Sequence, residues 1–174
     1  LIHRAFNFGI DSGLIREVNS SPVVGIQFGK EQEKKPEILT ISEIKRLLES
    51  AKQLDSYWYP IWALALMTGM RNGELYSLEF RDINWDNNTI SVSKSYNGRL
   101  KVIKSTKAGY WRTVPMSSEL RAFLLELKKN AGSRSTVLKH NHHWSRGMQA
   151  VELRKFCIGL GLPSVRFHAL RACF

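Results

Sequence analysis

Apolar residues recur with a helical spacing through the first part of the chain. Residues 1–18 place apolar side chains three or four positions apart, which predicts a helix. The segment Thr40-Ile41-Ser42-Glu43 has the spacing of a capping box, in which a hydroxyl and a carboxylate satisfy free amide groups at a helix start. Residues 57–67 are almost entirely apolar, which predicts a helix enclosed by the rest of the protein.

The pattern changes to alternating apolar and polar residues between positions 89 and 115, which indicates strands. Asn97-Gly98 predicts a hairpin with a type I′ turn, because that turn needs positive φ at both central positions. Return strands follow at 100–103 and 111–114, so the fold class is mainly α with a small three-stranded antiparallel β-sheet. Helical spacing returns at 117–129, at 145–160 and from about 164 to the end.

A stretch without periodicity separates the first predicted helix from the rest of the chain. Asn19-Ser20-Ser21-Pro22 and two later glycines break any repeat, and a charged run ends at Pro36. We therefore expect three parts: a helical piece at 1–20, a linker at 21–36 and a main domain at 37–174.

The chain is strongly basic, with 26 Lys and Arg against 15 Asp and Glu and a formal net charge of +11. No acid lies between Asn87 and Ser118, and Glu152 is the only acid from Ala131 onward. One such run could be a solvated surface, but two favour a polyanionic partner. Nucleic acid is preferred over membrane, because no apolar run approaches the ~18 residues of a spanning helix. The candidate nucleic-acid contacts are Lys94, Arg99, Lys101, Lys104, Arg112 and Arg146.

Arg71 follows a glycine at the end of the buried helix, so its backbone lies near the interior while its guanidinium needs an anion. A salt bridge to Glu74, one helical turn later, would satisfy it. The same carboxylate could also hold the guanidinium in place while its other donors face a phosphate. The sequence leaves both interpretations open, and they are compatible.

His168 and Arg171 fall one turn apart on one helix face, with apolar neighbours that would anchor the helix inward. A histidine there could also be an ordinary core residue, but no acid is near in sequence to pair with the arginine. Lys107 sits at a predicted turn, where it could protonate a leaving alkoxide or simply contact a DNA backbone. Lys101 and Lys104 are rivals for the same role.

Metal and cofactor sites are not expected. His140, His142 and His143 lie close together, but no Cys, Asp or Glu at ligand spacing accompanies them. No glycine-rich phosphate loop is present. Cys157 and Cys173 have apolar helical surroundings, as reduced cysteines of an intracellular protein do, so we expect a cytoplasmic location.

Three motifs in this chain resemble those of the tyrosine recombinase (phage integrase) family. Thr-Gly-Met-Arg-Asn-Gly-Glu-Leu at 68–75 is similar to the family's first-arginine motif. The segment 105–115, with Lys107 and Arg-Thr-Val-Pro, resembles its lysine-bearing hairpin and the strand after it. His168-Ala169-Leu170-Arg171 is similar to its His-x-x-Arg box. The resemblance covers roughly 37–174, and residues 1–20 resemble the last helix of the family's N-terminal core-binding domain.

The resemblance implies the tyrosine-recombinase catalytic-domain fold and site-specific recombination or integration of double-stranded DNA. In that family a tyrosine attacks the phosphate, giving a 3′-phosphotyrosyl link without metal or other cofactors. By resemblance, Arg71 and Arg171 clamp the phosphate, His168 handles protons, Lys107 is the general acid and Glu74 supports Arg71. The resemblance also implies tetramers of the full-length protein on two DNA sites, and a bacterial or phage protein that acts on the chromosome in the cytoplasm.

One family feature is missing from these 174 residues. The nucleophilic tyrosine should follow the His-x-x-Arg box, yet every tyrosine of this chain precedes it, and Ala172 stands where the family often has His. We therefore expect a catalytic domain without its C-terminal part, which binds DNA but does not cleave it. The alternatives are a non-catalytic DNA-binding module derived from a recombinase and, with less support, an RNA-binding protein that uses the basic hairpin.

Overall fold

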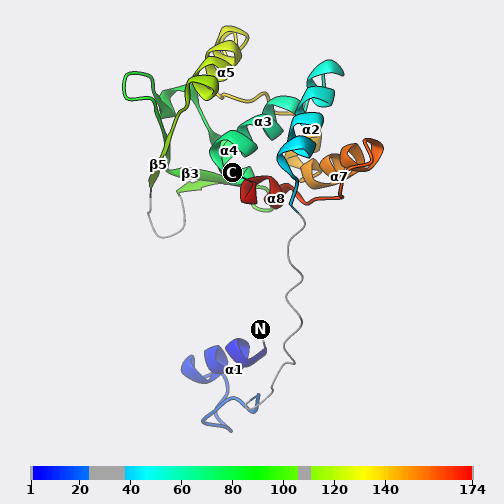
Figure 1. Ribbon diagram of the computed structural model, residues 1–174. Helices are drawn as coiled ribbons and strands as arrows, with labels where there is room; N and C mark the ends of the chain where they lie inside the picture. Colours follow the sequence, from blue (N-terminus) through cyan, green and yellow to red (C-terminus); the bar gives the residue numbers. More distant parts are fainter. Residues whose placement is uncertain (1, 24–37, 106–110, 174) are drawn as a thin grey trace. The chain divides into compact units, whose positions relative to one another are not determined.

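The computed structural model describes residues 2–23, 38–105 and 111–173 (Figure 1). The chain divides into two compact units, Leu1–Lys35 and Pro36–Phe174. In the first unit helix α1 spans Ile2–Asp11, which is shorter than the predicted 1–18. Gly13 has a positive φ of 67°, a conformation that suits glycine and takes the chain out of the helix.

Two helices of the second unit follow the sequence prediction closely. Helix α2 (Ile41–Gln53) opens with the predicted capping box, in which Thr40 Oγ1 accepts from the Glu43 amide and Glu43 Oε2 accepts from the Thr40 amide at 2.7 Å. Helix α3 (Tyr59–Thr68) is buried along most of its length. It ends at Gly69, whose φ of 59° is left-handed, as is usual at a helix C-terminus.

The remaining elements follow α3 along the chain. In chain order they are α4 (Asn72–Ser77), η1 (Phe80–Asp82), β1 (Ile83–Asn84), β2 (Thr89–Val92), β3 (Lys94–Asn97), β4 (Val102–Ser105), β5 (Arg112–Pro115), α5 (Ser118–Lys129), α6 (His142–Ser145), α7 (Gln149–Gly159) and α8 (Phe167–Ala172). In Figure 1 the strands lie on one side of α3 and α4, and α2 and α7 lie on the other.

The strands form a three-stranded antiparallel sheet in the order β1-β2-β5 and a separate two-stranded hairpin, β3-β4. The fold class was therefore predicted correctly, but the membership of the sheet was not. Strand β2 pairs with β5 from Thr89↔Pro115 to Val92↔Arg112, and β3 then pairs with β4 from Lys94↔Ser105 onward. One extended stretch of chain thus changes partner at Ser93, so the predicted return strand joins the hairpin and not the sheet.

The predicted type I′ turn at Asn97-Gly98 is wrong, although the hairpin itself is present. Asn97 pairs with Val102, which leaves a four-residue loop between β3 and β4. The Asn97 side chain accepts hydrogen bonds from the amides of Arg99 and Leu100 at 3.1 and 3.2 Å. Positive φ occurs at Lys101 (52°) and not at the two predicted positions. The asparagine thus stabilises the turn through its side chain and not through its backbone conformation.

The core of the second unit forms around α3. Trp62 and Leu64 of α3 are fully buried, and Leu47 of α2, Leu153 of α7 and Leu170 of α8 belong to the same cluster. Of the helix predicted at 145–160, the structure forms α7 (Gln149–Gly159) as its main part. The preceding helix α6 begins earlier, at His142, and ends at Ser145, and Gly147, whose φ is 78°, lies between the two helices. Burial of these side chains at α3 holds α8, near the end of the chain, beside the start of α4.

Helix α4 packs tightly on strand β3. A Cβ atom at Gly73 would lie 2.5 Å from the backbone oxygen of Tyr96, so the helix can approach the strand only because residue 73 has no side chain. The buried hydroxyl of Ser77 lies within hydrogen-bonding distance of the backbone oxygen of Lys94 in the same strand, at 3.1 Å, and of that of Gly73 in its own helix, at 3.0 Å. Together the two residues fix the β3-β4 hairpin against the helix that follows Arg71.

Replacing Gly73 with alanine should therefore destabilise the domain. The added methyl group must displace strand backbone, which costs about 1–3 kcal/mol in a packed region. Urea unfolding followed by circular dichroism would measure the loss. Gly159→Ala is the matched control, because its Cβ would meet nothing within 4 Å and its φ is ordinary for a helix. Equal stabilities of the two variants would contradict the close packing of α4 on β3.

Candidate functional site

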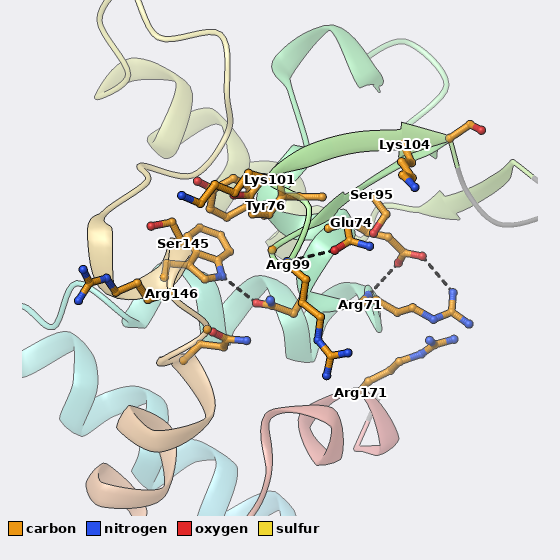
Figure 2. Close-up of a pocket in the computed structure, with 18 of the residues that line it drawn as sticks. Arg71, Glu74, Tyr76, Ser95, Arg99, Lys101, Lys104, Ser145, Arg146 and Arg171 are labelled. Carbon is orange, nitrogen blue, oxygen red and sulfur yellow. Dashed lines mark hydrogen bonds and ion pairs between the residues drawn. The ribbon is translucent and has the colours of Figure 1, made fainter. Parts of the chain in front are cut away.

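A cleft of about 1520 Å³ opens between α4, the β3-β4 hairpin, the α6–α7 connection and α8. Figure 2 shows Arg71 and Arg171 extending into the same part of this cleft from separate elements, with Lys104 on the hairpin and Arg146 farther along. Of the lining residues only Glu74 is acidic, whereas seven are basic. The basic lining residues are Arg71, Arg99, Lys101, Lys104, Arg112, Arg146 and Arg171.

Arg71 lies at the turn between α3 and α4. The left-handed Gly69 redirects the chain there, and the Arg71 amide donates to Glu74 Oε2 at 2.8 Å, which closes the first turn of α4. The Arg71 side chain gives a second bond, from Nη1 to Glu74 Oε1 at 3.0 Å. It is nevertheless 59% exposed, so the other donors of this guanidinium remain available to an anion in the cleft.

The carboxylate of Glu74 is only 2% exposed and binds a second arginine, Arg112 of β5. Arg112 Nη1 donates to Oε1 at 2.9 Å and Nη2 donates to Oε2 at 2.7 Å, in a bidentate arrangement. Burial alone would raise the pKa of Glu74. The hydrogen bonds from Arg112 and Arg71 outweigh it and lower the pKa to about 2. The group is therefore an anion over the whole physiological range.

Arg171 reaches the cleft from α8. Phe167 and Leu170 of this short helix are buried, and they anchor it beneath the cleft. Among the described residues no ion pair involves Arg171, so its charge adds to that of Arg71. His168, on the same helix, is exposed and is not among the residues that line the cleft.

The structure separates the predicted nucleic-acid contacts into two groups. Arg99, Lys101, Lys104 and Arg146 line the cleft, three of them on the hairpin and its loop. Lys94 does not line it, because its ammonium group forms ion pairs with Glu79 and, at 3.1 Å, with Asp82.

Two more basic residues were predicted to act in the site, Arg112 and Lys107. Arg112 does line the cleft, but its guanidinium is engaged by Glu74. Lys107, the predicted general acid, lies outside the described residues. The two alternative candidates for the general acid, Lys101 and Lys104, both line the cleft.

An aromatic cluster on the cleft wall was not predicted. The ring of Tyr76 stacks on Tyr96 with centroids 4.2 Å apart and on His140 at 3.7 Å, and Trp144 meets Tyr76 edge-on at 4.9 Å. Trp144 Nε1 donates to Asn72 Oδ1 at 2.7 Å. The four rings come from β3, α4, the segment before α6, and α6 itself, so spacing along the chain gave no signal for them.

The imidazole of His140 is stacked and hydrogen-bonded within this cluster. Its Nε2 lies 2.7 Å from the backbone oxygen of Tyr76, and burial lowers the pKa of the imidazole. In the described part of the chain, no group of three or more His, Cys, Asp or Glu side chains is arranged to hold a metal ion. Likewise, none of the helices within the described ranges is long and apolar enough to cross a membrane.

Comparison with known proteins identifies the family. A sequence profile described as the phage integrase family matches residues 37–174, which is most of the chain. A protein of Escherichia coli (strain K12) named "Putative defective protein IntQ" is 27% identical over 113 residues, covering 65% of this chain and 27% of the relative. This chain therefore belongs to the phage integrase family.

Solved structures share the fold. The Tn1549 transposon integrase, in complex with a circular intermediate DNA, superposes with a TM-score of 0.73 at 20% identity, covering 99% of this chain and 62% of that one. A lambda integrase dimer bound to a COC′ core site gives 0.66 at 19% identity, covering 99% and 61%. The fold is thus that of the tyrosine recombinases. This chain spans about a quarter of the length of IntQ and less than two thirds of either integrase chain.

The low pKa of Glu74 should make the domain acid-sensitive. Its folded-state pKa of about 2 lies below the ordinary 4.5, so the carboxylate contributes stability above pH 4.5 that is lost as the pH falls toward 2. The difference between 4.5 and about 2 corresponds to at most about 3.5 kcal/mol. We expect Glu74→Gln to have a smaller loss of unfolding free energy across this window than the unmodified protein has.

Denaturant unfolding at a series of pH values from 2 to 7 would measure this difference. Glu49→Gln, which removes an exposed carboxylate of α2, serves as the control and should follow the unmodified protein. If Glu74→Gln lost as much stability between pH 4.5 and 2 as the unmodified protein, the ionic network around Glu74 would not exist in solution.

Proposed function

We propose that residues 37–174 are the catalytic domain of a tyrosine recombinase, which binds double-stranded DNA and holds a phosphodiester between Arg71 and Arg171. The observation that carries this proposal is the convergence of both guanidinium groups on one basic cleft. Membership of the phage integrase family supports it, as do integrases of the same fold that were solved bound to DNA. The wider role is recombination or integration of a mobile genetic element.

The two arginines would act on charge that grows during the reaction. Attack on the phosphorus by a tyrosine breaks the bond to the 5′-oxygen, forms a 3′-phosphotyrosyl link and leaves a 5′-hydroxyl. Negative charge rises on the non-bridging oxygens in the transition state, and fixed donors aimed at them stabilise it most. Arg71 is held by Glu74 and Arg171 by the buried face of α8, so neither needs to reorganise when that charge appears.

Proton transfers would be handled by two further residues. We assign protonation of the leaving 5′-oxygen to Lys107, with Lys101 and Lys104 as rivals that line the cleft. His168 would assist proton handling from α8, one turn before Arg171. The family mechanism keeps the phosphodiester energy in the covalent link, so no cofactor is assigned.

Tyr76, which lines the cleft, is a poor candidate for the nucleophile. The ring of Tyr76 is enclosed between Tyr96 and His140, and burial together with the neighbouring Tyr96 raises the pKa of its hydroxyl. A nucleophile needs the opposite shift, toward easier loss of its proton.

The other parts of the proposal concern organisation. Residues 1–20 would be the last helix of a core-binding domain and 21–36 a linker; the family profile begins at 37, which agrees with this division. A lambda integrase tetramer bound to a Holliday junction shares the fold with a TM-score of 0.67, which supports a tetramer on two DNA sites for the whole protein. The cytoplasm, where a chromosome is accessible, is the proposed location.

Arg71→Ala and Arg171→Ala should each lower strand cleavage by ~10²–10³-fold while leaving duplex affinity within about threefold. The substrate is a duplex selected from a random pool for binding to this chain, and hydrogen peroxide supplies the attacking oxygen in place of a tyrosine. Gel analysis of 5′-hydroxyl ends gives the rate, and filter binding at several salt concentrations gives the affinity. Arg46→Ala, on the exposed face of α2, is the control.

The outcomes separate the candidate functions. Duplex binding with peroxide cleavage that needs both arginines supports the recombinase domain. Tight, salt-dependent binding without any cleavage would favour the non-catalytic DNA-binding module. Cleavage that survives either substitution would remove the proposed phosphate clamp.

Lys107→Ala should lower cleavage of ordinary DNA but not of DNA with sulfur at the 5′ bridging position. A thiolate leaves without protonation, so the general acid becomes unnecessary and the rate should return to within about tenfold of the unmodified protein. Lys101→Ala and Lys104→Ala are tested in parallel, and the variant that sulfur rescues identifies the acid. A Lys107→Ala protein that stays slow on the sulfur substrate would exclude this role.

A further inference from the structure

The buried carboxylate of Glu74 is shared by two arginines. Its Oε1 accepts from Arg112 Nη1 at 2.9 Å and from Arg71 Nη1 at 3.0 Å. Its Oε2 accepts from Arg112 Nη2 at 2.7 Å and from the Arg71 amide at 2.8 Å. All four lone-pair positions of the carboxylate are therefore used, and Arg71 contributes only one side-chain N–H to them.

The charges of this group explain why a second arginine matters. Arg71 and Glu74 alone would form a neutral pair, which attracts a phosphate weakly. With Arg112 the group carries a net charge of +1, and Arg171 raises the charge at that end of the cleft to +2. A buried carboxylate must also be fully hydrogen-bonded. Without Arg112, it would take further N–H groups from Arg71 and turn that guanidinium away from the cleft.

We propose that Arg112 is a positioning residue, which acts on the phosphate through Glu74 and not by contact with DNA. It neutralises the carboxylate and occupies half of its acceptor positions, so that Arg71 keeps its remaining donors directed into the cleft. This inference rests on the proposed function, because it concerns the same phosphate site. It replaces the prediction from sequence that Arg112 contacts DNA.

The exposures of the two side chains fit these different roles. The Arg112 side chain is 35% exposed, and both of its terminal nitrogens donate to Glu74. The Arg71 side chain is 59% exposed, and only one of its own terminal nitrogens donates to the carboxylate. Position 112 should specifically require arginine. A lysine ammonium is a compact charge that cannot bind both carboxylate oxygens in the parallel geometry of a guanidinium.

The test compares Arg112→Gln with the double variant Arg112→Gln/Glu74→Gln in the peroxide cleavage assay. Arg112→Gln should slow cleavage about 100-fold, with duplex affinity changed by less than about threefold, because Glu74 then withdraws Arg71. The double variant should recover to within about tenfold of the unmodified protein, because no buried anion remains to compete for Arg71. Arg112→Lys should stay slow although it keeps the charge.

A readout that does not depend on DNA tests the same positioning. The side-chain ¹H–¹⁵N signal of Arg71, assigned by its loss in Arg71→Ala, should shift in Arg112→Gln and return toward its original position in the double variant. Circular dichroism reports whether each variant is folded. If Arg112→Gln is unfolded, the double variant and Arg112→Lys carry the comparison.

Arg99→Gln is the matched control, since Arg99 lines the cleft from the hairpin loop. It should weaken duplex binding, and adding Glu74→Gln should not restore that binding. The positioning role is supported if cleavage recovers in Arg112→Gln/Glu74→Gln while duplex binding does not recover when Glu74→Gln is added to Arg99→Gln. Lost duplex affinity in Arg112→Gln that Glu74→Gln does not restore, or an unchanged Arg71 signal, would overturn the inference. Absence of cleavage by the unmodified chain would instead overturn the proposed function, while the Arg71 signal still decides the role of Arg112.

Discussion

The arrangement of the cleft depends on one buried anion. Glu74 is almost completely enclosed, yet it accepts four hydrogen bonds and keeps its charge because two guanidinium groups surround it. These bonds join the start of α4 to strand β5, where Arg112 lies 38 residues after Glu74 in the chain. Loss of either arginine would leave a buried charge with fewer hydrogen bonds, which is more costly than loss of an exposed ion pair.

The remaining parts of the site are held in position by close packing and burial of apolar side chains, and not by charge. Gly73 lets the hairpin backbone approach α4, and the Ser77 hydroxyl comes within hydrogen-bonding distance of β3 there. Across the cleft from the hairpin, Phe167 and Leu170 of α8 pack into the core. Arg171 of the same helix is thereby directed into the cleft. Residues far apart in sequence therefore meet through ordinary packing, and only their charged ends are left facing solvent.

Much of the local structure could be predicted from sequence because its causes are local. The capping box at Thr40 and the left-handed Gly69 each act within a few residues. The Glu74–Arg71 bond is of the same kind, since it spans one helical turn. The convergence of Arg71 with Arg171 was expected from the family resemblance, and no periodic pattern of the chain indicates it.

Features that arise from tertiary pairing could not be predicted in this way. The bond from Arg112 to Glu74 and the ion pairs of Lys94 link separate elements, and nothing in the neighbouring residues distinguishes these cations from the cleft-lining ones that form no ion pair among the described residues. The Asn97 turn was assigned wrongly because an asparagine side chain can replace the backbone conformation that the sequence suggested. Charge along the sequence thus indicated the class of partner but not which cations remain free.

The stack of Tyr96, Tyr76 and His140, closed by Trp144, has a mechanical consequence. Planar rings in face-to-face contact resist tilting, so the hairpin cannot swing at its base without separating them. The basic side chains that it carries therefore share one rigid wall with the start of α4. The stack thus restrains the base of the hairpin, and less conformational entropy is lost when a ligand binds to a wall that is already ordered.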